Sequence, residues 1–323
     1  MTITFRRAVR ENVPLLIGCI GPSGGGKTMS AMRLAKGLAK GLAGDKPFAV
    51  IDTEAGRAKH YAEMFAFDHA DLAPPFRPSA YVEAIKAAEV AGYPVVVVDS
   101  MSHVWSGDGG VLDWQEEELD RMAGDDWKKR EAVKMAAWIK PKMGHKEMVQ
   151  KLLQLRCHVI LCFRAEEKVK MVKDERNKTQ IVPQGWQPIC DKNLPYELTL
   201  SFLLTPEAPG IPKPIKLQEQ HRAFIRLDAP LDEQAGVRLA EWAAGGAKVL
   251  PTSQNATGVD SEALAGIAED WRLLIVESDN WESLKATFVK ACRWSKTTAA
   301  HAAFLPTLTA AKDKAKAALE GKL

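Results

Sequence analysis

An eight-residue segment near the N-terminus fits the pattern GxxxxGK[ST] without a mismatch: Gly21, Pro22, Ser23, Gly24, Gly25, Gly26, Lys27 and Thr28. Glycines at such positions let backbone N–H groups turn inward around phosphate oxygens, where a Cβ atom would clash. An apolar stretch, Leu15–Ile20, precedes the segment, and Thr28–Leu42, rich in Ala, Leu, Met and Lys, follows it. This strand–loop–helix context predicts a phosphate-binding loop that ends at Met29.

Two side chains of the loop are suited to nucleotide chemistry. Lys27 can reach the β- and γ-phosphates, and the hydroxyl of Thr28 is a ligand for Mg²⁺. The helix that starts there also points the positive end of its dipole at the anion. No [NT]KxD segment serves convincingly for guanine. We therefore predict ATP with Mg²⁺ as the bound pair.

Four short apolar runs with little alternation are typical of strands that are covered on both faces: Leu15–Ile20, Phe48–Asp52, Val95–Asp99 and Val159–Phe163. Helix-favouring stretches separate them at Thr28–Leu42, at Ser79–Ala91 with Ser79 as the N-cap, and at Lys146–Leu155. Strand–helix alternation of this kind predicts an α/β fold with a central, mostly parallel sheet.

Two carboxylates follow the middle strands. Asp99 ends the run Val95–Asp99, where a carboxylate can hold Mg²⁺ opposite the phosphate-binding loop. Glu54 lies just past the strand Phe48–Asp52 and can polarise an attacking water; the alternative is a helix-capping or solvated glutamate.

The pattern changes after Phe163. Lys168–Val172 and Thr179–Val182 alternate around a polar turn, which predicts a β-hairpin. Further strands are predicted at Tyr196–Leu204, Ile215–Leu217 and Ala223–Leu227, with a closing helix at Asp232–Ala244. We expect a core at residues 1–245, a linker at 246–260 and a small module of two or three helices at 261–323.

Charge is unevenly spread along the chain. Residues 103–127 hold eight acidic residues against one arginine, whereas residues 128–178 hold fifteen basic residues against six acidic ones. A basic block can contact a polyanion, and the alternative is a set of solvated helix faces. The candidates for contacts with DNA phosphates lie in the predicted hairpin: Lys168, Lys170, Lys173, Arg176 and Lys178.

These segments together resemble the RecA-like ATPase core over roughly residues 12–245. The resemblance implies the sheet order 5-1-4-3-2, with Glu54 as the catalytic glutamate and Asp99 at the magnesium site. Tyr61 matches the position that stacks on adenine in bacterial RecA; the alternative is a core or surface aromatic. Arg164 stands where RecA has a γ-phosphate-sensing Gln, so it either contacts the γ-phosphate or serves as a structural ion-pair partner.

The chain also looks like phage-encoded RecA-like nucleotide-binding proteins, some of which act in single-strand annealing and recombination, and this resemblance is closer still. This implies a Mg²⁺-dependent ATPase that binds single-stranded DNA, forms a homo-oligomer and meets a single-strand-binding protein or a recombinase. Cations from a neighbouring subunit often complete such sites, and the candidates are Arg164, Lys168 and Arg222. The alternatives are an ATP-dependent scaffold or switch acting through protein partners and, with no clear acceptor pocket, a small-molecule phosphotransferase.

Cysteine usage and hydropathy bear on location. Five cysteines without a CxxC pair indicate neither a zinc site nor a disulfide framework, and no apolar run approaches the roughly 18 residues that span a bilayer. We expect a cytoplasmic protein, located in the host cytoplasm if a phage encodes it, with no contact to membranes.

Overall fold

A computed structural model of the chain describes residues 10, 12–43, 47–173, 179–245, 261–276, 278, 280–295 and 304–320. The chain divides into two compact units, Met1–Lys248 and Val249–Leu323. The predicted linker at 246–260 lies outside the described residues.

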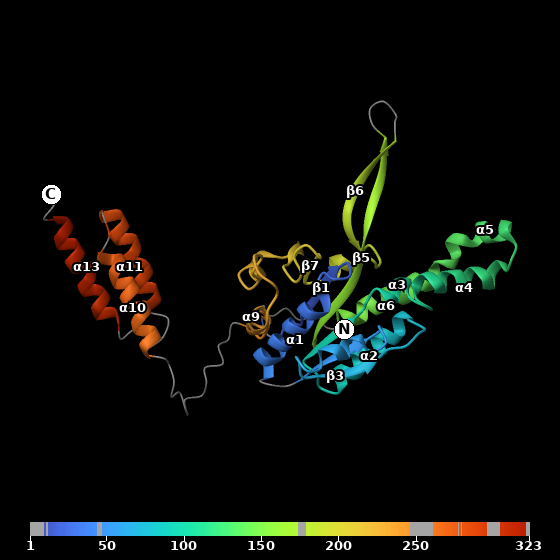
Figure 1. The fold of residues 1–323 in the computed structure, drawn as a ribbon, viewed down its shortest axis with the longest axis horizontal. Helices are drawn as coiled ribbons and strands as arrows, with labels where there is room; N and C mark the ends of the chain where they lie inside the picture. Colours follow the sequence, from blue (N-terminus) through green and yellow to red (C-terminus); the bar gives the residue numbers. More distant parts are fainter. Residues whose placement is uncertain are drawn as a thin grey trace, which may run out of the picture. The chain divides into compact units, whose positions relative to one another are not determined.

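A twisted, mostly parallel sheet forms the centre of the first unit (Figure 1). Its strands follow the order β3-β2-β4-β5-β1-β7-β8, and β6 pairs with β5 beyond this path. The bounds are β1 Leu16–Gly21, β2 Phe48–Asp52, β3 Phe67–Asp71, β4 Val95–Asp99, β5 His158–Lys173, β6 Thr179–Pro188, β7 Leu200–Leu203 and β8 Lys213–Lys216. The central part, β7-β1-β5-β4-β2, confirms the predicted order 5-1-4-3-2.

Helices cover both faces of the sheet, which explains the continuous apolar strands. Every residue of β1, β2 and β4 is buried. Alternate residues join different cores: Val95 and Val97 pack with helices α1 (Lys27–Ala43) and α9 (Glu233–Ala243). Val96 and Val98 pack with α2 (Pro78–Val90) and α6 (Ile139–Leu152) on the other face. The predicted α/β class is therefore confirmed.

Some local predictions were wrong. The segment Ala223–Leu227 is not a strand but a set of turns after the short helix α8 (Glu219–Arg222), anchored by the buried side chain of Ile225. Ser79 is not an N-cap, because α2 begins one residue earlier at Pro78, whose fixed φ suits the first helical turn.

One strand boundary and one whole strand also differ from the sequence prediction. The start of the segment predicted as strand 196–204 lies in a helical turn, α7 (Leu194–Glu197). The edge strand β3 was not predicted, because its sequence FDHAD has three polar residues out of five.

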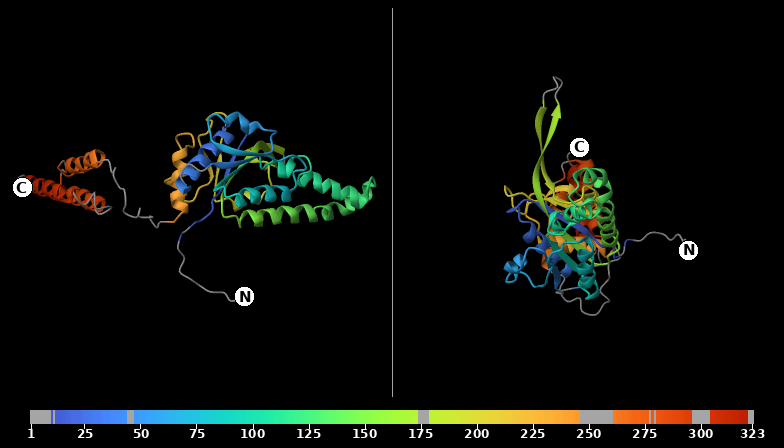
Figure 2. Two further views of the ribbon diagram at one scale, coloured as in Figure 1. Left: turned by 90° about the horizontal axis from the view of Figure 1, so that it is seen from below. Right: turned by 90° about the vertical axis from the view of Figure 1, so that its right-hand side faces the viewer.

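A β-hairpin and a helical arm extend from the sheet (Figures 1 and 2). Strand β5 continues past the sheet and pairs antiparallel with β6, from Ala165 opposite Pro188 to Lys173 opposite Thr179. The arm contains α3 (His103–Ser106), α4 (Val111–Ala123) and α5 (Trp127–Ala137) before α6.

Within this arm the acidic stretch faces the start of the basic block. Arg130 of α5 pairs with both Glu116 and Asp120 of α4. Lys140 of α6 pairs with Glu118 at 3.0 Å. Part of the charge asymmetry seen in the sequence is thus neutralised inside the arm, as the solvated-face alternative expects.

The second unit contains three described helices, α10 (Ser261–Val276), α11 (Trp281–Ser295) and α13 (Leu305–Glu320). They share a small apolar core of Ile275, Leu284, Ala291, Leu308, Ala311, Ala315 and Leu319. Throughout the described part of the chain, every helix is too short or too polar to cross a bilayer.

His158 at the start of β5 makes the stability of the first unit depend on pH. Its buried Nδ1 accepts a hydrogen bond from the backbone N–H of Leu15 at 3.1 Å, and burial lowers its pKa from 6.5 to about 4. In the unfolded chain His158 therefore binds a proton below pH 6.5, whereas in the folded chain it does so only below about pH 4. We expect the free energy of unfolding to fall by about 3 kcal/mol across this window.

Urea unfolding at a series of pH values measures this effect. His158→Gln keeps an acceptor for Leu15 without a titratable ring, so its stability should decline less between pH 6.5 and 4. The exposed His60 gives the matched control, His60→Gln, which should keep the wild-type dependence. If the free energy of unfolding changes with pH identically in the wild type and in His158→Gln, His158 is not the origin of the pH dependence.

Candidate functional site

The parallel register brings the polar residues of four strands to one edge of the sheet. Gly21 at the end of β1 pairs with Arg164 of β5. Asp99 at the end of β4 pairs with Cys162 of β5 and with Asp52 of β2. Because ligands bind at the carboxyl ends of such strands, this edge is the expected site.

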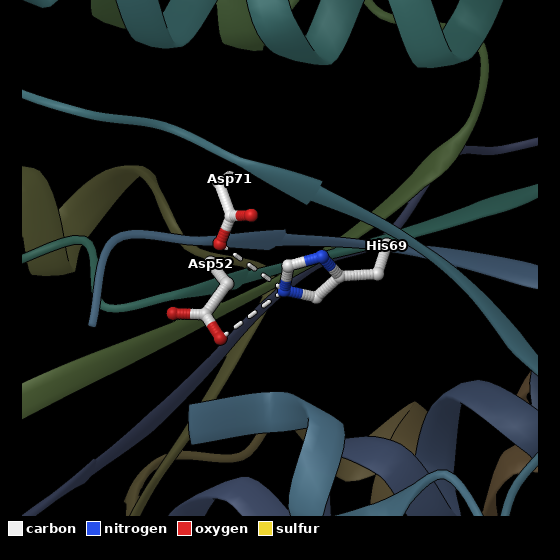
Figure 3. A group of neighbouring side chains, drawn as sticks. All are labelled: Asp52, His69 and Asp71. Carbon is white, nitrogen blue, oxygen red and sulfur yellow. Dashed lines mark hydrogen bonds and ion pairs between the residues drawn. The ribbon is translucent and has the colours of Figure 1, made fainter. Parts of the chain in front are cut away.

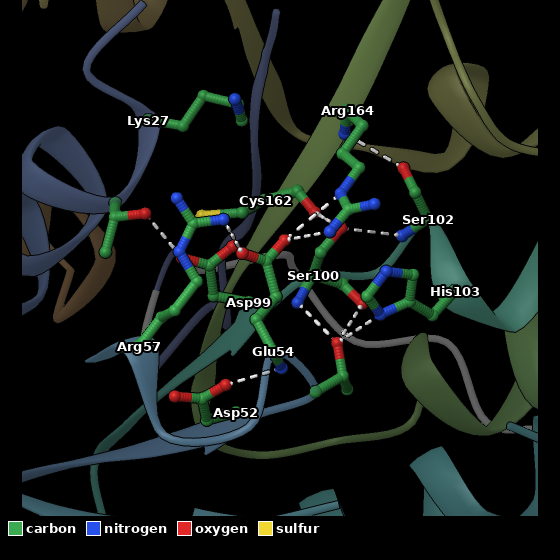
Figure 4. Close-up of polar contacts among 12 residues, drawn as sticks. Lys27, Asp52, Glu54, Arg57, Asp99, Ser100, Ser102, His103, Cys162 and Arg164 are labelled. Carbon is green, nitrogen blue, oxygen red and sulfur yellow. Dashed lines mark hydrogen bonds and ion pairs between the residues drawn. The ribbon is translucent and has the colours of Figure 1, made fainter. Parts of the chain in front are cut away.

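A cavity of about 800 Å³ opens at this edge. The lining includes the phosphate-binding loop, both carboxylates and the two arginines near them; its residues are Pro22, Ser23, Gly24, Gly26, Lys27, Thr28, Glu54, Arg57, His60, Tyr61, Asp99, Arg164, Ala165 and Ile189. The structure thus brings together residues that follow β1 and β2 with residues of β4 and β5, which are far apart in the sequence (Figure 4).

The loop after β1 depends on its glycines. A Cβ atom on Gly25 would lie 2.2 Å from the carbonyl oxygen of Leu204, next to β7. Gly26 has a φ of 84°, in the left-handed region that side chains disfavour. The helix α1 starts directly afterwards at Lys27, so its N-terminal N–H groups face the cavity side of the loop.

Lys27, Thr28 and Asp99 have the donor set that a nucleotide with Mg²⁺ requires. The ammonium of Lys27 donates to the carbonyl of Pro22 at 2.7 Å, so it lies over the loop. The hydroxyl of Thr28 donates to Asp99 at 2.5 Å. Burial raises the pKa of Asp99, and the hydrogen bond from Thr28 opposes this rise. A buried carboxylate beside a hydroxyl, with an ammonium nearby, fits a site that would hold a divalent cation next to a phosphate group.

Glu54 is held between two arginines. Arg164 donates to one carboxylate oxygen through Nε at 3.1 Å and Nη2 at 2.7 Å. Arg57 donates to the other oxygen at 2.8 Å. Partial burial acts to raise the pKa of Glu54, but the hydrogen bond and charge of Arg164 and the charge of Arg57 outweigh it and lower that pKa. In this arrangement the carboxylate of Glu54 is therefore ionised, its negative charge is balanced by the two arginines, and it is a weak base.

A hydrogen-bond network beneath these residues fixes the strand ends (Figure 4). The hydroxyl of Thr53 lies 2.7 Å from Nδ1 of His103 and accepts from the N–H of Ser100 at 2.8 Å. The N–H of Arg164 donates to the hydroxyl of Ser102 at 2.9 Å. The backbone of Arg164 is thus tied to the segment that follows Asp99.

Asp52 positions the turn that carries Glu54. One of its carboxylate oxygens accepts from the N–H of Glu54 at 2.6 Å, and the other accepts from the N–H of Ala58 at 2.8 Å. The turn contains Ala55 at a φ of 56°, a conformation that is uncommon outside glycine. These two hydrogen bonds therefore stabilise a backbone that is otherwise unfavourable.

His69 and Asp71 of β3 lie beside Asp52 (Figure 3). Nε2 of His69 is 3.3 Å from Asp52 and 3.6 Å from Asp71, and Asp71 also pairs with Lys59. Both carboxylate oxygens of Asp52 already accept hydrogen bonds from backbone N–H groups. The group of Asp52, His69 and Asp71 therefore serves to hold the turn that carries Glu54 in place.

The remaining predicted nucleotide contacts lie in or beside the cavity. Tyr61 closes the 3₁₀ helix η1 (Arg57–Tyr61), lines the cavity and packs partly against the core. Met29 lies on α1 and packs partly against the same core. Gly21 and Gly25 contribute backbone next to Leu204.

The predicted DNA contacts are only partly described. Lys168 and Lys170 are exposed on β5, and Lys168 pairs with Glu166 at 3.3 Å. The side chain of Lys173 and the whole of Arg176 and Lys178 lie outside the described residues. Arg222 is exposed on α8 and pairs with Glu219.

Sequence reasoning did not single out Arg57 or His60, which also line the cavity. The spacing of three residues between Glu54 and Arg57 was the available signal, since such pairs meet on one face of a helical turn. His103 does not line the cavity but contacts Thr53 below Glu54.

Comparison with known proteins gives one family. A family model described as an AAA domain matches residues 14–200, which is more than half of the chain and spans β1 to the start of β7. No curated protein matches the chain.

Asp52→Asn tests the role of the turn. An amide side chain has one acceptor oxygen, so either Glu54 or Ala58 loses its hydrogen bond. We expect the free energy of unfolding to fall by about 1–3 kcal/mol and the amides of Glu54 and Ala58 to exchange hydrogen faster. Asp71→Asn, at an exposed neighbour in the same group, is the control and should have little effect. A similar loss in both variants would contradict a specific role for Asp52.

Proposed function

The chain belongs to the AAA domain family, and on that premise we propose that it is a Mg²⁺-dependent ATPase that acts on single-stranded DNA. The observation that carries the proposal is the cavity in which the phosphate-binding loop, Asp99, Glu54 and Arg164 meet. A Gly-rich loop alone would fit any phosphate ligand. The added pair of carboxylates fits a metal-assisted transfer of a phosphoryl group to water.

Binding is assigned to the loop and α1. Lys27 exchanges its contact with the Pro22 carbonyl for phosphate oxygens, and the backbone N–H groups of residues 23–28 surround the same phosphates. Thr28 and Asp99 would hold Mg²⁺, which would supply positive charge beside the phosphates. Tyr61 offers its ring to the adenine.

We assign Glu54 as the general base and Arg164 as the group that controls it. While both arginines hold Glu54, its carboxylate is a poor proton acceptor. A triphosphate attracts a guanidinium more strongly than a single carboxylate does, because the triphosphate carries more negative charge and more acceptor oxygens. When Arg164 turns to the γ-phosphate, Glu54 regains basicity next to the attacking water.

The hairpin is the proposed DNA contact. It is the continuation of β5, so Lys168 and Lys170 follow Arg164 by four and six residues on one strand. Exposed lysines of this kind neutralise phosphates without reading bases. Together with the resemblance to phage RecA-like proteins, this supports a role in phage-type recombination, annealing or replication, in a homo-oligomer that meets a single-strand-binding protein or a recombinase.

A second candidate is an ATP-dependent scaffold or regulatory switch that acts through protein partners. Three large apolar side chains of the arm, Met135, Ile139 and Met143, are exposed at intervals of four residues along α5 and α6. Such a stripe favours contact with another protein. Capture of a protein partner that requires ATP and ignores DNA would favour this candidate over the first.

Two substitutions separate binding from hydrolysis. Lys27→Ala should weaken ATP binding about 10- to 100-fold, because it removes a charged hydrogen-bond donor. Glu54→Gln should keep ATP affinity and lower kcat about 100- to 10,000-fold, because it removes the base. Calorimetry with Mg²⁺ and ATP gives the affinities, and phosphate release gives kcat. Equal loss of ATP affinity in both variants would be incompatible with the role of Glu54.

Charge reversal tests the hairpin. Lys168→Glu combined with Lys170→Glu should reduce the affinity for a labelled oligothymidine and flatten its dependence on salt, since two phosphate contacts are lost. The control is Lys128→Glu with Lys129→Glu, an equal charge change on exposed residues of α5. Equal effects of the two double variants, or no salt-dependent binding by the wild type, would exclude the hairpin as the DNA contact.

A further inference from the structure

The helical second unit contains a groove between α11 and α13. Its volume is about 320 Å³, and its lining combines apolar residues with lysines: Trp281, Leu284, Lys285, Phe288, Val289, Lys312 and Lys316. We call this feature the lysine-rimmed groove. It lies wholly within the unit Val249–Leu323 and is separate from the nucleotide cavity.

The helical periods explain how the groove forms. On α13 the buried positions Leu308, Ala311, Ala315 and Leu319 face the core, and the neighbouring positions Lys312 and Lys316 stand one turn apart beside them. On α11 Leu284 is buried, while Trp281 and Val289 keep 43% and 51% of their surface exposed. The short side chains of Ala311 and Ala315 leave the facing apolar residues of α11 uncovered.

Exposed apolar surface of this kind in a small unit is costly in water, because little core compensates for it. Phe288 is partly buried against the core of the unit, and the ammonium of Lys312 lies over its ring at 5.0 Å from the centroid. The floor therefore continues from the core at Leu284 to the exposed side chains of Trp281 and Val289, and this exposed part has the character of a binding surface.

The rim of the groove has one sign of charge. Among the described residues that line it, three are lysines and none is acidic. Lys316 has only a loose pairing with Glu320 at 3.7 Å, and Lys312 pairs with the adjacent Asp313. An apolar floor inside a positive rim is complementary to apolar side chains flanked by carboxylates.

We propose that the lysine-rimmed groove binds an acidic peptide segment of a partner protein that carries one or two large apolar side chains. The volume is suited to such side chains, and three ammonium groups would meet the flanking carboxylates. The acidic helix α4 of this chain is a poor occupant, because Arg130 already holds Glu116 and Asp120. A nucleic-acid backbone would satisfy the lysines and leave the apolar floor empty.

The test uses the full chain and a fluorescent synthetic peptide with a run of aspartates followed by leucine and phenylalanine. Fluorescence anisotropy measures its affinity. Lys285→Glu combined with Lys316→Glu should weaken binding about tenfold or more by reversing the rim, and Trp281→Ala should do so by removing part of the floor. Lys314→Glu lies on an exposed position of α13 away from the groove and should bind like the wild type.

Two further measurements keep the result unambiguous. Far-ultraviolet circular dichroism should be equal in all variants, because the substituted residues are exposed. A second peptide with serines in place of leucine and phenylalanine should bind about tenfold or more weakly than the first. Equal binding of both peptides, or no binding of the first peptide, would overturn the proposal. The proposal would also be overturned if an oligothymidine displaced the first peptide from the wild type but not from the double variant Lys285→Glu with Lys316→Glu.

Discussion

The parallel pairing of β5 with both β1 and β4 determines where every polar group of the site lies. Its register sets Arg164 beside Gly21 and Cys162 beside Asp99. The phosphate-binding loop, Asp99 and Arg164 therefore meet at one edge. The pairing of β2 with β4 adds Glu54 at the same edge. A shift of one residue in β5 would turn Arg164 away from the cavity and bring a neighbouring side chain to its place.

The same strand gives the site a route to the rest of the molecule. Beyond Arg164, β5 leaves the sheet and forms the hairpin, and the returning strand is tied back where the N–H of Ile189 donates to the carbonyl of Arg164 at 2.8 Å. Ala165 and Ile189 also line the cavity. The backbone of Arg164 thus lies at the base of the hairpin and beside the cavity.

The sequence was sufficient for features that depend on local chemistry. The glycines of the loop, the buried valines of β4 and the strand-ending Asp99 each carry their own signal, and the sheet order followed from the family resemblance. The ion pair between Glu54 and Arg164 joins residues 110 positions apart, so only the folded register brings them together. The edge strand β3 and the turns at 223–227 were missed because packing against neighbours overrides a weak local pattern there.

We propose that a triphosphate and Glu54 compete for Arg164. A crystal structure of the protein with Mg²⁺ and a non-hydrolysable ATP analogue tests it most directly. The account predicts phosphates enclosed by residues 21–28, with Arg164 on the γ-phosphate and its bonds to Glu54 broken. An analogue bound in this loop while Arg164 still holds Glu54, or an analogue bound elsewhere, would contradict it.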